Sequence, residues 1–212
     1  MTTRARAARP QRATFTNAAR RAQIVESAID TIAELGYGRA SFAQIASRAG
    51  LSSTRLISYH FAEKDDLIRE VLRTVVAKFT DYVRPRTERE SSPRARLLTA
   101  LEANVDFIGD HRRDVVTLHE IERNYRTTDG RPVMQQRAEE DLETLASWLR
   151  DGQRLGEFRD FDPEGMALFI LALRNGVIHR YHVKPDLDLP ALKRELIAMV
   201  DLATRFSSAS NG

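Results

Sequence analysis

Apolar residues recur at helical spacing along almost the whole chain, and this pattern restricts the fold more than any other feature. Ile24, Ala28 and Ile32 lie four residues apart, which places them on one face of a helix. Pro85 and residues 86–93 break the pattern, and helix-length patterns resume beyond them. No segment alternates like a β-strand over more than four residues. Glycine and proline are scarce, with 10 and 7 in 212 residues. The sequence therefore predicts an all-α fold.

Composition excludes several classes of protein. The chain is 42% hydrophobic, which allows a sizeable core, and it contains no cysteine for disulfides, thiolate nucleophiles or cysteine-bound metals. Its longest apolar run, from Met166 to Leu173, has eight residues, whereas a membrane span needs about 20. The N-terminus has no apolar signal segment. We therefore expect a soluble cytoplasmic protein with no membrane partner.

Positive charge is concentrated at the N-terminus. Six arginines and no acidic residue occur within the first 21 positions: Arg4, Arg6, Arg9, Arg12, Arg20 and Arg21. The whole chain carries only +3, so the remainder is mildly acidic. Basic arms of this kind often follow phosphates or enter a minor groove. A disordered solubilising tail and an arginine-rich transit peptide are the alternatives. We expect residues 1–18 to form a disordered basic arm.

Residues 19–66 read as a three-helix domain that contains a helix-turn-helix. A first helix, starting near Ala18, ends at Gly36, and Ser41 with Gln44 fits a capping box that opens a second helix. Gly50 closes that helix, because glycine accepts a positive φ at little cost. A third helix should then run over residues 53–61, with Ser53 as its cap.

The third helix has two different faces. Four residues at docking positions are expected to pack inward: Leu56, Ile57, His60 and Phe61. Five others remain free for DNA: Ser53, Thr54, Arg55, Ser58 and Tyr59. Arg55 can make paired hydrogen bonds to guanine in a major groove, and hydroxyl groups are common phosphate contacts. This division is typical of a recognition helix.

This region resembles the TetR family of bacterial transcriptional repressors over about residues 19–70. The resemblance rests on the helix from Ile24 to Gly36 and on four short motifs: Ser41-Phe42-Ala43-Gln44-Ile45-Ala46, Ala49-Gly50, Ser58-Tyr59-His60-Phe61 and Lys64-Asp65-Asp66-Leu67. It implies phosphate contacts from Ser41 and Lys64, backbone contacts from Tyr59 and His60, and a recognition helix that starts at Ser53 and Thr54. The full set of predicted DNA contacts is Ser41, Gln44, Ser52, Ser53, Thr54, Arg55, Ser58, Tyr59, His60 and Lys64.

One spacing departs from the family pattern. Gly50 and Phe61 are eleven residues apart, where the family usually has ten, and the extra residue lies near Leu51 to Ser53. Arg55 then falls where the family often has a small residue, so it could read a base, bind phosphate or lie in solvent. Each residue also has a purely structural alternative. His60 could be a packed core histidine, Tyr59 a cover over the apolar seam, and Lys64 part of a solvated first turn.

Residues 67–206 are predicted to form a helical domain for dimerisation and ligand binding, followed by a disordered tail over residues 207–212. The expected helices cover residues 94–109, 112–126, 132–153, 163–182 and 189–206. The 163–182 segment has two apolar stripes, more than a helix with one wet side needs. The resemblance implies that the last two long helices form a dimer interface. The candidates are Met166, Phe169, Ile170, Leu173 and Val177, and the alternative is a central helix of a monomer.

The resemblance also implies a small-molecule pocket in this second domain. We select polar or aromatic groups on otherwise apolar stretches: Phe107, His119, Glu122, Trp148, Asn175 and His179. Buried structural groups are the alternative for each. His179 with His182, or His119 with Glu122, gives only two metal ligands without a third, so we predict no metal and no cofactor.

The expected function is that of a sequence-specific DNA-binding regulator, chiefly a repressor released from near-palindromic operator DNA by an unknown small molecule. A homodimer would present two recognition helices about one DNA turn apart. An activator or dual regulator of the same fold, and a helical interaction protein without ligand control, are the alternatives. The chain has no nucleophile elbow, Walker loop or dinucleotide glycine fingerprint, so we do not expect an enzyme. Residues 22–84 hold eight basic and eight acidic residues, so the arm is expected to supply much of the attraction to DNA.

Overall fold

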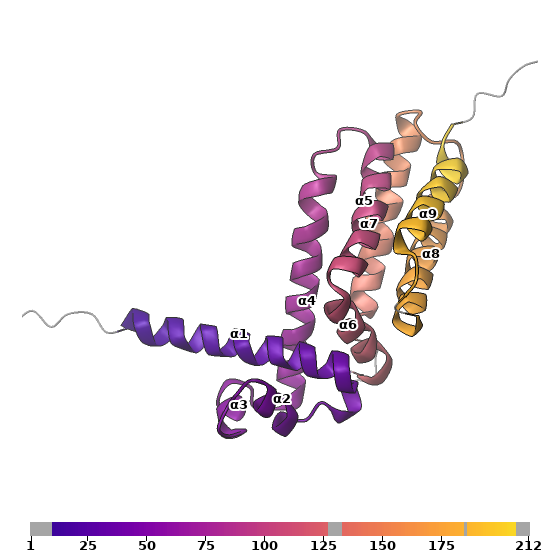
Figure 1. Ribbon diagram of the computed structural model, residues 1–212. Coiled ribbons are helices and arrows are strands. Elements are labelled where there is room, and N and C mark those ends of the chain that lie inside the picture. The colour runs from indigo at the N-terminus through magenta and orange to yellow at the C-terminus, as the bar shows by residue number, and fades with distance from the viewer. Residues whose placement is uncertain (1–9, 127–132, 185, 207–212) are drawn as a thin grey trace, which may run out of the picture. The chain divides into compact units, whose positions relative to one another are not determined.

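The computed structural model describes residues 10–126, 133–184 and 186–206, with side chains from residue 17 onward (Figure 1). These ranges contain helices and turns but no β-strand, which confirms the all-α prediction. The helices are α1 (Pro10–Leu35), α2 (Phe42–Arg48), α3 (Arg55–His60), α4 (Lys64–Thr87), α5 (Pro93–Asp110), α6 (Arg112–Asn124), α7 (Gln135–Arg154), α8 (Pro163–Val183) and α9 (Leu189–Thr204). Among them, no helix combines the length and apolarity that a bilayer span requires.

The chain divides into two compact units between Thr74 and Val75, inside α4. The sequence predicts this boundary at residues 66–67, so the first turns of α4 belong with the N-terminal unit instead. The sequence also predicts a break near Pro85. In the structure α4 continues through Pro85 and ends two residues later at Thr87. A proline is tolerated there because it removes a hydrogen bond only from the last turn of the helix.

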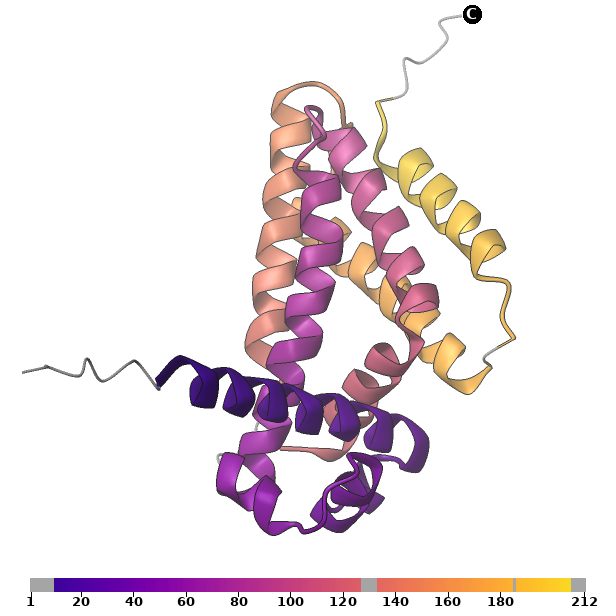
Figure 2. The same cartoon turned by 60° about the vertical axis from the view of Figure 1, so that its left-hand side comes forward.

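The N-terminal unit is built by the local signals that the sequence contains. The Ser41 hydroxyl accepts a hydrogen bond from the Gln44 backbone nitrogen at 3.3 Å, so it caps α2 as predicted. Gly50 has a φ of 64° in the turn that follows. Figures 1 and 2 show α2 and α3 on the same side of α1. Ile24, Ile45 and Ile57 are buried in the core that these helices share.

Helix α1 begins earlier than its apolar pattern predicts. The pattern indicates a start near Ala18, whereas the helix begins at Pro10. Proline suits the first position of a helix, and Gln11, Arg12 and Ala13, which follow it, are good helix formers even without an apolar stripe. Residues 10–18 therefore extend the helix rather than belonging to a disordered arm. The rest of the predicted arm, residues 1–9, lies outside the described residues, as does the predicted tail at 207–212.

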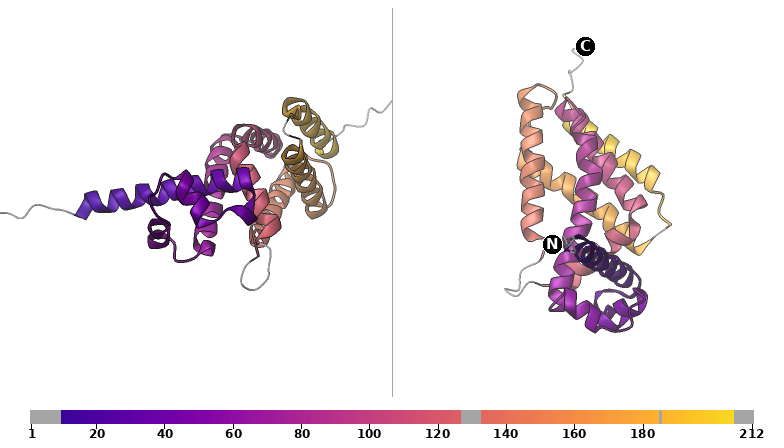
Figure 3. Two further views of the ribbon diagram at one scale, coloured as in Figure 1. Left: turned by 60° about the horizontal axis from the view of Figure 1, so that its bottom comes forward. Right: turned by 90° about the vertical axis from the view of Figure 1, so that its left-hand side faces the viewer.

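The C-terminal unit is a helical bundle whose five predicted helices occur in the predicted order. Helix α7 packs against α8, and α9 packs against α5. Figure 3 shows this bundle from two further directions. Figure 2 shows α8 crossing obliquely relative to α5 and α7. One buried cluster includes Leu97, Leu149 and Ile170, and a second includes Phe107 and Tyr181. The candidate ligand residues lie around this second cluster and between the two.

Candidate nucleic-acid interface and bundle cavities

Helix α3 presents polar residues outward and is held by two buried side chains. Ile57 and Phe61 are almost fully buried one helical turn apart. The six predicted contacts in and before the helix are all exposed: Ser52, Ser53, Thr54, Arg55, Ser58 and Tyr59. Tyr59 is the most prominent among the large side chains, with 74% of its surface accessible. The arrangement can place hydroxyl groups, a phenol and a guanidinium against an external partner.

Leu56 does not pack inward as the sequence predicts. It is 40% exposed, and His60, one turn further on, is only half-buried. A helix of six residues touches the rest of its unit along one narrow line, and Ile57 and Phe61 occupy that line. Leu56 therefore joins the outward face, which sequence reasoning missed because its apolar character suggested the core.

The loop before α3 absorbs the extra residue. The Ser53 hydroxyl accepts a hydrogen bond from the Arg55 backbone nitrogen at 3.1 Å, and α3 begins at Arg55 with Thr54 at its N-cap position. Ser53 was predicted to be that cap, so the helix starts later than expected. Phe61 nevertheless keeps its buried position. The extra residue therefore changes the loop that leads into α3 and leaves the packing of Phe61 in place.

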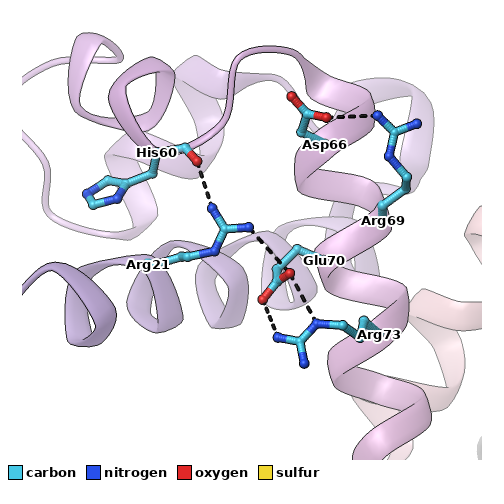
Figure 4. Close-up of polar contacts among 6 residues, drawn as sticks. All are labelled: Arg21, His60, Asp66, Arg69, Glu70 and Arg73. Carbon is cyan, nitrogen blue, oxygen red and sulfur yellow. Dashed lines mark hydrogen bonds and ion pairs between the residues drawn. The ribbon is translucent and has the colours of Figure 1, made fainter. Parts of the chain in front are cut away.

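Arg21 fastens the end of α3 to two other helices (Figure 4). Its guanidinium donates to the His60 carbonyl oxygen at 2.7 Å and to the Glu70 carboxylate at 3.3 Å. The same guanidinium lies 4.1 Å from the centre of the Phe61 ring. Arg73 and Arg21 together hold the pKa of Glu70 below its usual value. Sequence reasoning counted Arg21 with the basic arm, whereas its partners lie within the unit.

Two further predicted DNA contacts, Lys64 and His60, already have hydrogen-bond partners inside the N-terminal unit. Lys64 donates to the Tyr37 carbonyl oxygen at 3.2 Å, and its ammonium lies 4.4 Å from the centre of the Tyr37 ring. Burial lowers the pKa of Lys64. Burial, followed by the nearby Arg21, lowers the pKa of His60. Asp66 accepts hydrogen bonds from Arg69 at 2.8 Å and from the Glu63 backbone nitrogen at 3.3 Å, which fixes the first turn of α4 (Figure 4).

Two cavities lie within the C-terminal unit. The larger, here called the His119 cavity, has a volume of about 340 Å³ and walls from α4, α5, α6, α7 and α8. The other, the Trp148 cavity, has a volume of about 260 Å³. Five of the six predicted ligand residues line the first: Phe107, His119, Glu122, Asn175 and His179. Trp148 lines the second. The first volume falls in the range of ordinary small-molecule sites, and the second is slightly below it.

Sequence reasoning missed three charged residues that line both cavities. Asp141 accepts a hydrogen bond from Arg137 Nε at 2.9 Å, and its other oxygen lies 3.6 Å from Arg174 Nη1. We call Arg137, Asp141 and Arg174 the partition. Two signals could have indicated it: Arg137 and Asp141 are four residues apart on one helix, and Arg174 interrupts the apolar sequence of α8.

Three histidines gather beside the larger cavity. The ring centre of His119 lies 5.6 Å from that of His179 and 4.7 Å from that of His182. His119 Nε2 and His182 Nδ1 are buried without a hydrogen-bond partner among the described residues. Burial, followed by the neighbouring His182, lowers the pKa of His119. Within the described ranges, no set of three histidine, cysteine or acidic residues is arranged to hold a metal ion.

The predicted dimer residues fall into two groups. Phe169 is 66% exposed and Leu173 is also exposed, whereas Ile170 is only 2% exposed and packs in the unit's own core. Ile170 is therefore unsuited to an interface, because it occupies the inward stripe of α8. Met166 and Val177 are half-buried against the two core clusters. Exposed apolar residues on α8 and α9 form what we call the α8–α9 face: Leu168, Phe169, Leu173, Met199 and Leu202.

An exposed helix anchored in a three-helix unit, followed by a bundle with internal cavities, defines a helix-turn-helix regulator. Residues 24–71 match the family model for bacterial regulatory proteins of the tetR family. Residues 90–201, more than half of the chain, match the model for the tetracyclin repressor-like C-terminal domain. The chain belongs to the TetR family of bacterial transcriptional regulators.

Curated relatives are similar over part of the chain. The transcriptional regulator BetI of Cronobacter sakazakii is 37% identical over 89 residues, which are 41% of this chain and 44% of that protein. BetI of Pseudomonas fluorescens is 35% identical over 89 residues, 41% of this chain and 45% of that protein. The chain thus spans less than half the length of the curated relatives it matches.

Solved structures share the whole fold. A transcriptional regulator from Saccharomonospora viridis, determined in complex with choline, has a TM-score of 0.77 and 24% identity, covering 90% of this chain and all of that one. A TetR transcription regulator from Haloarcula marismortui has a TM-score of 0.75 and 22% identity over 89% of this chain and all of that one. At these identities the likeness concerns the fold.

Proposed function

We propose that the protein is a cytoplasmic transcriptional repressor that binds a near-palindromic operator as a homodimer and leaves it when a small molecule occupies the bundle. The observation that carries this proposal is the outward face of α3, fixed from behind by Ile57, Phe61 and Arg21. A helix held in this way can enter a major groove without rearranging its own unit.

The side chains of α3 suit both kinds of DNA contact. Arg55 can make paired hydrogen bonds to guanine, and the exposed Leu56 can contact a thymine methyl group. Ser58 and Tyr59 can donate to phosphates, as can Ser41 and Gln44 at the start of α2. Lys64 can reach a phosphate with a hydrogen that its bond to Tyr37 leaves free, because an ammonium has three donors.

Dimerisation would use the α8–α9 face. Its exposed leucines, Phe169 and Met199 would be unfavourable in water, and a second copy would cover them with the same surface. A twofold axis then sets two copies of α3 at a fixed spacing. Helix α4 extends into both units, so a ligand that favours one arrangement of the bundle can change that spacing. Couplings of this kind usually amount to about 5–150-fold in affinity.

The test begins with selection of bound duplexes from a random library, which should yield a near-palindrome. Arg55→Ala should then weaken binding to the selected duplex by about 1–3 kcal/mol in a titration followed by fluorescence anisotropy. Arg154→Ala is the matched control, because Arg154 is an exposed arginine at the end of α7. Failure to prefer any duplex over scrambled competitor, or equal losses in both variants, would contradict the proposal. A reporter gene under the selected site distinguishes a repressor from an activator.

A further inference from the structure

The two cavities of the C-terminal unit share part of their walls. Five residues line both of them: Phe79, Asn104, Arg137, Asp141 and Arg174. The partition lies at this shared wall, with one charged group contributed by α8 and two by α7. The side chains of the partition thus contact both volumes.

The partition contains more positive than negative charge. Two guanidiniums face the single carboxylate of Asp141, and the contact from Arg174 is the longer of the two, at 3.6 Å against 2.9 Å from Arg137. The Arg174 side chain is only 17% exposed, and its remaining contacts are with the Asn175 side-chain oxygen, at 3.2 and 3.3 Å. Burial lowers the pKa of Arg174, and the carboxylates of Asp141 and Glu122 oppose this shift.

The other ionisable groups near the partition do not reverse this balance. Glu122 lines the His119 cavity and interacts with Arg174, while burial raises the pKa of its carboxyl. His119 and His179 add no negative charge, and Arg84 at the Trp148 cavity is paired with Asp81 at 3.6 Å. Within the partition itself two guanidiniums face one carboxylate, and this geometry favours an anion.

The walls on either side of the partition are mostly apolar. Phe107, Leu118 and Ile178 line the His119 cavity, and Leu97 and Trp148 line the other. We infer that the two cavities form one divided site for an amphipathic carboxylate, a carboxylic acid with an apolar tail, and that Asp141 occupies the position of its carboxylate when the ligand is absent. The planar fork of an arginine matches a carboxylate, as the contacts to Asp141 already show.

This inference rests on the proposed function, since it names the class of effector. It also gives this chain a different class of ligand from the choline in the structure of the Saccharomonospora viridis regulator. A quaternary ammonium is bound by aromatic faces and carboxylates, whereas here it would approach two guanidiniums. The inference therefore predicts a different class of ligand for this chain within one shared fold.

The test compares three ligands with the same tail: decanoate, decanol and decyltrimethylammonium. The full-length protein is titrated with each below its micelle concentration, and the signal is the fluorescence of Trp148, the single tryptophan of the chain and a lining residue. Decanoate should bind at least about 10-fold more tightly than the other two, because only it can form a charge-assisted hydrogen bond with a buried guanidinium. Equal affinities, or preference for the ammonium, would overturn the inference.

Two substitutions in the partition sharpen the test. Arg174→Gln should weaken decanoate about 10-fold or more while leaving decanol unchanged, and the decanol measurement also shows that the variant is folded. Asp141→Asn should strengthen decanoate binding, since the competing carboxylate is gone. Arg150 lies on the same helix as Asp141 but outside the lining of both cavities. Arg150→Gln should therefore change the affinity for neither decanoate nor decanol. Weaker decanoate binding in Asp141→Asn would contradict the placeholder role.

The outcomes separate this inference from the proposed function. If decanoate binds but does not lower affinity for the selected duplex, the ligand class stands and ligand-controlled repression fails. If none of the three ligands binds while the duplex does, the inference fails and the DNA-binding function stands. If Arg174→Gln does not fold, the comparison of the three ligands on the unchanged chain decides.

Discussion

The two units differ in where their candidate functional groups lie: on the outer surface in the N-terminal unit, and around internal cavities in the C-terminal unit. In the N-terminal unit the inside is closely packed and apolar, and the groups offered to a partner stand outside on α3. In the C-terminal unit the corresponding groups line two cavities, and charged residues such as Arg174 are largely buried. One unit is built to present a rigid surface, and the other to enclose something.

The difference has an energetic consequence. Exposed polar groups cost little to maintain, so α3 can carry several while two buried residues hold it. Inward-facing charges must be paired or shift their pKa, as the partition and His119 do. Stability in the first unit should therefore depend on a few apolar anchors, and in the second on the protonation and pairing of polar groups.

The largest expected effect is on stability, and it distinguishes the buried face of α3 from its exposed face. Ile57→Ala should lower the free energy of unfolding of the N-terminal unit by about 2–5 kcal/mol, because it removes methyl groups from a fully packed position. Leu56→Ala, its exposed neighbour, should change that free energy by less than about 1 kcal/mol but weaken binding to a selected duplex. Urea unfolding followed by circular dichroism measures the first quantity. Equal destabilisation by both substitutions would remove the distinction between the two faces.

Much of the N-terminal unit could be predicted because its signals are local. A capping serine, two glycines with positive φ and residues four apart each determine the backbone within a few positions. Arg21 and Leu56 were misassigned because their environments depend on contacts across the unit: Glu70 is 49 residues from Arg21 in sequence. A short-range pattern contains no information about such a partner.

In the C-terminal unit the helices and six residues lining the cavities could be predicted, whereas the signals for the partition were too weak to select it. Polar groups in apolar stretches led to His119, Glu122 and Trp148, which do line the cavities. Arg137 and Asp141 lie on a helix rich in charge, so nothing in the sequence distinguishes them from solvated neighbours. Ile170 was placed in a dimer interface because a helix with two apolar stripes does not show which stripe faces the molecule's own core.

An intermediate effect tests how much the stability of the N-terminal unit depends on the backbone conformation of its glycines. Gly50 and Gly38 both have open space where a Cβ would lie, but only Gly50 has a positive φ, of 64°. Gly50→Ala should therefore destabilise the protein by about 1–2 kcal/mol, the cost of a left-handed conformation for a residue with a side chain. Gly38→Ala should leave stability unchanged or raise it slightly, because it restricts the unfolded chain. Similar midpoints in urea for the two variants would show that the turn relaxes.

The smallest expected effect compares histidines in the two units. Both His60 and His119 have a lowered pKa, so between that value and the ordinary value near 6.5 the unfolded chain binds more protons than the folded one. Stability should therefore fall as the pH is lowered from about 7.5 to about 5.5. The carboxylates of Asp66 and Glu70, whose pKa values are also lowered, lose their stabilising effect only at more acidic pH. Glu122, with its raised pKa, acts in the opposite sense at the acid end of this range.

His60→Gln and His119→Gln isolate the two contributions, because the effect of Glu122 cancels in the difference from the unchanged protein. Each variant should show a shallower decline of unfolding free energy with acidification, measured by urea titration at a series of pH values. The two changes should add in the double variant, since the histidines belong to different units. A decline that persists unaltered in the double variant would assign the acid sensitivity to groups other than these rings. A decline removed by His119→Gln alone would confine it to the unit in which charges face inward.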